Sequence, residues 1–220
     1  MIEAPRFNTW PIVEELTAAA GGSLEVAPGT RPRLPFEGTQ FLDISTAAVA
    51  RLRARGAAAA VGVISAMPFA AAAFDCVCAF DIVEHVNDDE AAFAELARVS
   101  RAGAALLLSV PLHESAWTPF DEFVGHCRRY EPDDLAAKLH RHGFTIEKSA
   151  AYGMQPGSSL LLSLGMWFLT HRREHAMWWY NRVFMPIGLR RQKPLRFCAG
   201  LIDDAKVDTV LLVCRKTGKC

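Results

Sequence analysis

The stretch SAMPFAAAAFDCVCAFDIVEHVNDDEAAFAELARVSRAGAALLLSVP, from Ser65 to Pro111, decides the fold class. Phe74–Phe80 and Ala104–Val110 are short apolar runs with the length of buried strands. Between them, Asp88–Ser100 carries apolar side chains three and four positions apart, which predicts an amphipathic helix. A strand, a helix and a strand in this order predict two parallel strands joined by a crossover helix.

The same alternation continues on both sides of this stretch, with further helical patterns at Thr46–Arg55 and Glu131–His142. The predicted strands are Ser23–Ala27, Gln40–Asp43, Ala57–Gly62, Phe74–Phe80, Ala104–Val110, Thr145–Ala151 and Val207–Arg215. We therefore predict an α/β fold: a doubly wound, mostly parallel seven-stranded sheet with helices on both faces and an antiparallel last strand. Residues 1–157 and 199–220 would form this core, and residues 158–198 would form a helical insertion.

The charge balance excludes some classes of partner. Twenty-four Lys and Arg residues balance twenty-four Asp and Glu residues, so the net charge is zero and no global basic field is present. We therefore expect no binding to nucleic acid. The His, Asp and Glu residues show no ligand spacing along the chain, so no metal is expected.

Cysteine usage and hydropathy indicate a soluble protein. The six cysteines include no C-x-x-C pair, and Cys76 and Cys78 lie two apart in an apolar strand, as buried side chains on one face do. The N-terminus lacks the apolar segment of a signal peptide, and the longest apolar run, Leu160–Leu169, is too short for a membrane span. We expect a cytoplasmic location.

Two acidic residues lie at the first two strands. Glu25 belongs to the first strand, and Asp43 ends the second strand eighteen positions later. Doubly wound nucleotide-binding proteins place an acid there to accept hydrogen bonds from ribose hydroxyls. Each acid alone is a weak signal, but together they favour a nucleoside ligand at the carboxyl ends of the strands.

The fourth-strand stretch closely resembles that of class I S-adenosylmethionine-dependent methyltransferases that act on small molecules. The shared elements are Met67–Pro68–Phe69, Phe74–Asp75, Glu84–His85–Val86, Arg98–Val99 and Gly103. Gly125–Phe144 also looks like the family's segment before the sixth strand, so the resemblance covers Ser23–Ala151 and the closing strand. It implies S-adenosylmethionine as the cofactor.

The resemblance also implies roles for residues after the strands. Asp43 would hold the ribose and Ile44 would pack against adenine, while Phe80 and Asp81 would close on the sulfonium end. The other positions that it assigns to the cofactor are Glu25, Ala27, Pro28 and Gly29 along the methionine moiety, and Ala66 and Met67 at the adenine edge.

The chain departs from the family at the adenine edge and in the first loop. The family often has an Asp that accepts from the adenine amine where this chain has Val63, so backbone or Ser65 would have to make that contact. The first loop keeps only Gly29 of the expected glycines. We expect Ala27 to adopt a backbone conformation that needs no glycine.

The connection from the first loop to the second strand is short. Pro32 and Pro35 allow at most one helical turn there, so a helix dipole would contribute little to carboxylate binding. We therefore hypothesise that Arg31 or Arg33 binds the carboxylate of the methionine moiety.

Methyl transfer from a sulfonium requires an aligned nucleophile and, for a hydroxyl or an amine, a base. His113 directly follows the fifth strand, His126 lies in GHCRRY, and Tyr130 is placed to orient either one. His85 occupies the position of the family's E-H pair. Each of these residues is a catalytic candidate, and each also has an ordinary structural interpretation.

The insertion Ser158–Cys198 is much longer than a crossover needs. Seven Arg and Lys residues against one acid, with several aromatic residues, occupy Leu160–Cys198. Three interpretations stay open: helices that pack their aromatic residues on the core, a lid over an apolar pocket or a dimer face, and a surface that contacts an anionic membrane. The acceptor would be an apolar or anionic small molecule, and the protein a monomer or a homodimer.

The leading hypothesis is methyl transfer to an O, N or C nucleophile of a small molecule. The eroded first loop motivates an alternative, a cofactor-binding relic or adaptor without turnover. A nicotinamide-dependent dehydrogenase is less favoured, because the chain has no full G-x-G-x-x-G motif after its first strand.

Overall fold

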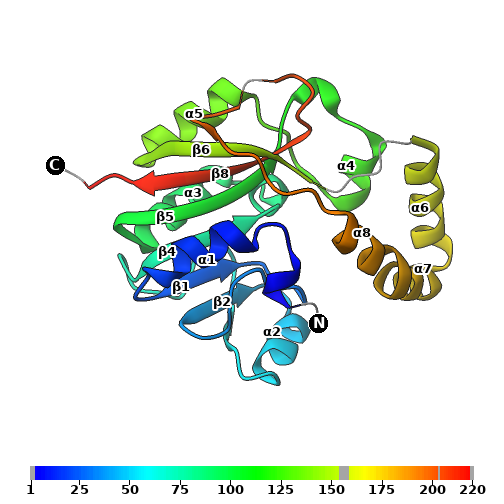
Figure 1. Cartoon of the computed structure of the whole chain (residues 1–220), viewed down its shortest axis with the longest axis horizontal. Helices are drawn as coiled ribbons and strands as arrows, with labels where there is room; N and C mark the ends of the chain where they lie inside the picture. Colours follow the sequence, from blue (N-terminus) through cyan, green and yellow to red (C-terminus); the bar gives the residue numbers. More distant parts are fainter. Residues whose placement is uncertain (1–2, 154–158, 203, 219–220) are drawn as a thin grey trace.

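A mixed sheet forms the centre of the computed structural model, which describes residues 3–153, 159–202 and 204–218. The described residues form eight strands in the order β3-β2-β1-β4-β5-β8-β6-β7 (Figure 1). The strands are β1 (Ser23–Val26), β2 (Thr39–Asp43), β3 (Ala58–Val61), β4 (Phe74–Phe80), β5 (Ser100–Pro111), β6 (Phe144–Tyr152), β7 (Cys198–Ala199) and β8 (Thr209–Lys216). The strands from β1 to β5 pair in parallel, whereas β8 runs antiparallel to both β5 and β6. The predicted fold class and the antiparallel last strand are confirmed.

The predicted number of seven strands is wrong by one. The additional strand, β7, has two residues and pairs with β6 at Lys148 and Ser149. A pair of residues is too short to produce a hydrophobic pattern, so the sequence carries no signal for it. Strand β5 also begins earlier than predicted, because α3 ends at Val99 and passes into it without a loop.

Helices cover both faces of the sheet. The described α-helices are α1 (Trp10–Ala18), α2 (Thr46–Arg53), α3 (Asp89–Val99), α4 (Pro119–Val124), α5 (Pro132–Arg141), α6 (Ser159–His171), α7 (Arg173–Trp179) and α8 (Met185–Arg191). Short 3₁₀ turns occur at Ala4–Arg6, Val83–His85 and Glu114–Ala116. Helix α1 lies in front of the sheet and α3 behind it (Figure 1).

Alternation along β4 shows how the core is divided. Val77 and Ala79 pack with the residues of α3 and α5, while Cys76 and Cys78 pack on the opposite face with residues of α1 and α2. All four side chains are buried. The predicted burial of both cysteines on one face is therefore confirmed.

No helix connects β1 to β2. Residues 27–38 form loops and turns instead, as the two prolines predicted. Leu34 in this loop is buried with Ile12 of α1 and Phe41 of β2, so an irregular segment covers sheet surface there.

The insertion is helical and extends beyond the carboxyl ends of the parallel strands, where α6 contacts α4 (Figure 1). A π-helical turn, Tyr180–Phe184, joins α7 to α8. The large aromatic side chains of the insertion are mostly exposed, for example Trp178 at 55% and Phe184 at 63%. The interpretation in which the aromatic residues of the insertion pack on the core is wrong for these side chains; Phe197 does pack on the core. Among the residues described, no helix is long and apolar enough to cross a membrane.

Candidate functional site

Three parallel strands end in residues with left-handed backbone. Ala27 after β1 has φ 55°, Asp81 after β4 has φ 49°, and His113 after β5 has φ 61°. Such a conformation costs a residue with a side chain about 1–2 kcal/mol. The expectation that Ala27 needs no glycine-like conformation is therefore wrong. Strained backbone conformations that cluster at the carboxyl ends of neighbouring strands are typical of a functional site.

Asp43 ties the second strand to the first loop. Its Oδ2 accepts a hydrogen bond from the backbone N–H of Gly29 at 2.8 Å, and its Oδ1 accepts one from Ser45 at 2.8 Å. The neighbouring Ile44 is 70% exposed, and Val63 is 40% exposed. An acid beside exposed apolar side chains suits a nucleoside, whose ribose hydroxyls donate hydrogen bonds and whose base is flat and apolar on both faces.

Glu25 closes the first loop from within. Its carboxylate is buried and accepts hydrogen bonds from the backbone N–H groups of Arg33 and Leu34 at 2.9–3.0 Å. Burial raises the pKa of Glu25 to about 7, against the opposing effects of these N–H groups and of the Arg33 guanidinium. Its contacts in this structure are to the loop backbone.

The two arginines of the loop point to different places. Arg31 donates to Asn181 Oδ1 at 2.8 Å and lies over the Tyr180 ring, so it holds the loop against the insertion. Arg33 lies over the Phe7 ring at 3.8 Å and near that of Phe80 at 5.8 Å. Of the two, Arg33 is the one beside the end of β4.

The segment after β3 presents its residues unequally. Val63 and Ala66 form an isolated antiparallel bridge, and Ala66 is exposed. The Met67 side chain is buried in the core, and its backbone N–H donates to Glu95. Ser65 is half-buried between them.

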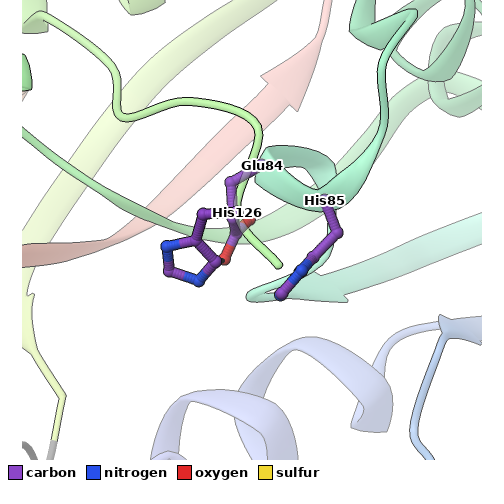
Figure 2. Close-up of side chains that lie close together, drawn as sticks. All are labelled: Glu84, His85 and His126. Carbon is purple, nitrogen blue, oxygen red and sulfur yellow. Dashed lines mark ion pairs between the residues drawn. The ribbon is translucent and has the colours of Figure 1, made fainter. Parts of the chain in front are cut away.

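A carboxylate and two imidazoles meet beyond the end of β4 (Figure 2). Glu84 and His85 come from the 3₁₀ turn Val83–His85, and His126 comes from the loop after α4. One ligand-type atom of each residue lies within 4.8 Å of the others, and the two imidazole rings are 4.7 Å apart. The figure shows all three side chains directed toward one region.

Glu84 is the most unusual member of this cluster. It is 1% exposed, and within the described part of the chain neither carboxylate oxygen has a hydrogen-bond partner. Burial, together with the charge of Asp81, raises its pKa well above the usual range. Such a group is rare because an unpartnered buried carboxylate costs free energy.

Both histidines are fixed through Nδ1. His126 Nδ1 lies 2.8 Å from Asp121 Oδ1, and His85 Nδ1 lies 3.0 Å from the carbonyl oxygen of Gly125. When Nδ1–H donates in these contacts, Nε2 of each ring keeps its lone pair. Burial and the charge of His126 lower the pKa of His85, against the effect of the Gly125 carbonyl, and favour the neutral ring.

Asp121 is itself held by a buried network. Arg129 donates to both of its oxygens and also to Asp208. Burial opposes ionisation of Asp121, but the hydrogen bonds from Arg129, Thr118 and His126 outweigh it and lower the pKa to about 2. Asp121 therefore stays charged and keeps His126 oriented.

The structure does not bring the other two catalytic candidates into this cluster. Tyr130 is buried, and its hydroxyl donates to Asp89 at 2.9 Å, so its side chain does not orient a histidine as expected. His113 Nδ1 lies 3.8 Å from Glu131, and its Nε2 is buried without a partner among the described residues.

Glu84 is a member of the cluster and Asp121 orients His126 within it. Neither was identified from the sequence as a site residue. The adjacent Glu-His pair was the available signal for Glu84. For Asp121 there was none, because the carboxylate caps α4 in a Thr118-x-x-Asp121 capping box, a pattern that occurs at many helices.

Residues 33–108 match the family model of a methyltransferase domain. A search of the curated proteins finds no match. An S-adenosylmethionine-dependent methyltransferase from Thermotoga maritima, described as a possible histamine N-methyltransferase, has a TM-score of 0.64 at 16% identity, with 97% of this chain and 91% of that chain covered. One from Methanosarcina mazei has a TM-score of 0.61 at 12% identity, covering 96% and 99%. The [4+2]-cyclase SpnF also has a TM-score of 0.61, at 19% identity, covering 94% and 79%.

At these identities the solved structures show the fold alone, and the cyclase illustrates that the fold does not fix the reaction. The domain match is independent of them, and it spans the Asp43 and Glu84 regions described above. The chain therefore has the fold of the class I S-adenosylmethionine-dependent methyltransferases and, over residues 33–108, the sequence pattern of a methyltransferase domain, which together imply S-adenosylmethionine as its cofactor.

Proposed function

We propose that this protein transfers a methyl group from S-adenosylmethionine to a nucleophilic O, N or C atom of a small molecule. When bound, the cofactor supplies an electrophilic methyl group on a sulfonium. The observation that carries the proposal is the pairing of Asp43, with its exposed apolar neighbours, and the Glu84 cluster along one edge of the sheet. Asp43 and its apolar neighbours would bind the adenosine, and the Glu84 cluster would lie at the nucleophile.

On the adenosine side, Asp43 would accept hydrogen bonds from the ribose hydroxyls. Each of its oxygens accepts one backbone hydrogen bond and retains capacity for another. Ile44 and Val63 would pack against the base. Arg33, beside Phe80, is better placed than Arg31 to bind the methionine carboxylate, because Arg31 is engaged by Asn181.

On the acceptor side, His85 and His126 would act at the nucleophile. Each retains an Nε2 lone pair that is able to take the proton of a hydroxyl or an amine, which is the protein's main chemical task in this reaction. Partly buried side chains fixed by hydrogen bonds would hold the acceptor in one orientation, and orientation contributes much of the rate. His113 and Tyr130 would support the loop around them.

The insertion would form the far side of the acceptor site. Arg31 of the first loop donates a hydrogen bond to the insertion. The insertion therefore depends for its position on the loop that Asp43 and Glu25 hold in place. It presents exposed aromatic residues and a cationic excess, which favour an acceptor with an apolar body or an anionic group. The same surface suits contact with an anionic membrane.

Calorimetry and turnover test the proposal in two steps. We expect the protein to bind S-adenosylmethionine and not NAD, and Asp43→Asn to weaken that binding. A panel of hydroxyl, amine and activated-carbon acceptors should then yield S-adenosylhomocysteine, detected by mass spectrometry. Preferential binding of NAD would overturn the proposal. Binding of S-adenosylmethionine without turnover across the panel would favour a cofactor-binding relic instead.

A further inference from the structure

We propose that Glu84, His85 and His126 bind a divalent transition-metal cation. The binding itself does not depend on the proposed methyl transfer, whereas the cation's role at the acceptor rests on it. No metal was expected from the sequence, because the three residues come from two segments about forty positions apart. The fold brings them together (Figure 2).

The donor atoms lie close to one another, somewhat farther apart than ligands on one cation. They lie within 4.8 Å of one another, and Nε2 of His126 is 4.0 Å from Oε1 of Glu84. Ligands bound at about 2.0–2.2 Å in a tetrahedral site lie roughly 3.3–3.6 Å apart. Side-chain movements of about an ångström would therefore place all three on one cation.

The surroundings of the histidines match those of metal ligands. A ligating imidazole typically donates its other N–H to a carboxylate or a backbone carbonyl, which fixes the ring and its tautomer. His126 has Asp121 in that position, and His85 has the carbonyl of Gly125. Arg129 in turn holds Asp121 with two hydrogen bonds, so the support extends one layer further.

Glu84 provides the independent observation. Its carboxylate is 1% exposed, lacks a hydrogen-bond partner among the described residues, and is directed toward the two rings. If the histidines acted as bases, neither oxygen of this buried group would have a partner in the described part of the chain. With a cation on Nε2 of each ring, activation of the acceptor would pass from the histidines to the cation. A bound cation would supply the missing partner and would account for the placement of all three side chains.

The chemistry of the donors selects the class of metal. Two imidazoles and one carboxylate suit Mn²⁺, Fe²⁺, Co²⁺ or Zn²⁺ better than Mg²⁺ or Ca²⁺, which prefer oxygen ligands. Three protein ligands leave at least one coordination position open. Asp81 lies close enough for its charge to act on Glu84, and it belongs to the end of β4 assigned to the sulfonium. The proposed metal site would thus lie near the position that the resemblance assigns to the methyl donor.

Cobalt binding provides the direct test. Untagged protein freed of metal by chelation would be titrated with Co²⁺ in the absence of S-adenosylmethionine, with visible absorption and calorimetry as readouts. We expect one equivalent to bind with the absorption of a four- or five-coordinate site. Glu84→Gln, which keeps the side-chain shape, and His126→Asn should each weaken binding at least a hundredfold. His175→Asn, which removes an exposed histidine on α7, should not change it.

Absence of stoichiometric Co²⁺ binding to the folded protein would overturn the proposal. Binding that Glu84→Gln and His126→Asn both leave unchanged would overturn it as well, because the cation would then lie elsewhere. Since no cofactor is present in this titration, cobalt binding by a protein that fails to bind S-adenosylmethionine would refute the proposed function and leave the metal site standing. Methyl transfer that is unaffected by chelation would refute the cation's role at the acceptor.

Discussion

Asp43 at the end of β2 accepts a hydrogen bond from the backbone N–H of Gly29 at 2.8 Å, so the acid of one strand fixes the loop that follows its neighbour. This contact couples the conformation of the loop to the residue expected to hold the ribose. It explains how a loop that keeps only Gly29 of the expected glycines, and that contains three prolines, holds a defined position without a following helix.

Asp43→Asn should weaken S-adenosylmethionine binding at least tenfold, because the amide loses one acceptor oxygen and hydrogen bonds to a charged acceptor contribute about 1.5–3 kcal/mol. Calorimetry measures the affinity, and thermal unfolding should show a loss of about 1 kcal/mol from the loop contacts. Glu37→Gln, an exposed carboxylate near the same loop, is the control and should change neither value. Equal affinity for the two variants would remove Asp43 from the site.

Ala27→Gly should stabilise the protein by about 1 kcal/mol. The left-handed conformation costs alanine about 1–2 kcal/mol, which glycine avoids. Glycine has greater conformational freedom in the unfolded chain, and this offsets only about 0.5–1 kcal/mol of the gain. Chemical denaturation measures the difference. Ala72→Gly is a matched control, since Ala72 has φ 51° and lies before the start of β4. Both variants should gain stability, but only Ala27→Gly should alter cofactor affinity. A loss of stability in Ala27→Gly would show that the left-handed backbone of Ala27 does not destabilise the folded protein.

Strand and helix positions follow from the sequence because each element has a hydrophobic period of its own. The pattern of β4, α3 and β5 is local and needs no knowledge of the rest of the chain. The two-residue strand β7 exists only because Ser149 and Lys148 of β6 lie opposite it, and no local pattern records that pairing.

The acceptor side of the site is less predictable for the same reason. Glu84 and His126 approach through the packing of α4 and its loop, and Arg129 reaches Asp208 across the fold. The sequence does identify Glu25 and Asp43 as acids at the strands, but it does not indicate which backbone groups they bind. It also predicts at most one helical turn after β1, which is consistent with the loop observed, and it fails on the backbone of Ala27, since φ depends on the chain beyond the residue.

Val63→Asp should increase the affinity for S-adenosylmethionine by about tenfold. Val63 is exposed at the position where the resemblance implies an acid for the adenine amine, and a hydrogen bond to a charged acceptor contributes about 1.5 kcal/mol or more. Ala58→Asp adds the same charge at an exposed position of β3 that pairs with Gln40, away from Asp43, and should give no gain. Calorimetry with the two variants checks this. Unchanged or weaker binding by Val63→Asp would show that adenine lies elsewhere.

Stability should fall as the pH rises from about 4.5 to 7, and Glu25 should cause much of this fall. Its pKa is raised from 4.5 to about 7 in the folded protein, so the folded state binds more protons than the unfolded state across this interval. The stabilisation that Glu25 contributes is greatest below pH 4.5 and is lost when the pH exceeds its folded-state pKa of about 7. It amounts to roughly 3 kcal/mol. Denaturant unfolding at several pH values measures the slope.

Glu25→Gln serves as the comparison, because a glutamine does not titrate. Its unfolding free energy should change less with pH in the same interval than that of the unchanged protein. Parallel slopes for the two proteins would mean that the carboxylate titrates normally in the fold, and the difference would then have to come from other groups.

The insertion should bind anionic vesicles and not zwitterionic ones. Trp178 and Phe184 are exposed, and the segment carries seven basic residues against one acid, each basic residue near an anionic surface contributing about 1 kcal/mol. Sedimentation with phosphatidylglycerol vesicles should retain the protein at low salt and release it at high salt, because salt screens exposed charges. The double variant Trp178→Ser, Phe184→Ser should bind weakly, whereas Trp117→Ser, an exposed tryptophan outside the insertion, should behave like the unchanged protein. Protein that stays in solution with anionic vesicles at low salt would leave the insertion as a lid or a contact between copies of the chain.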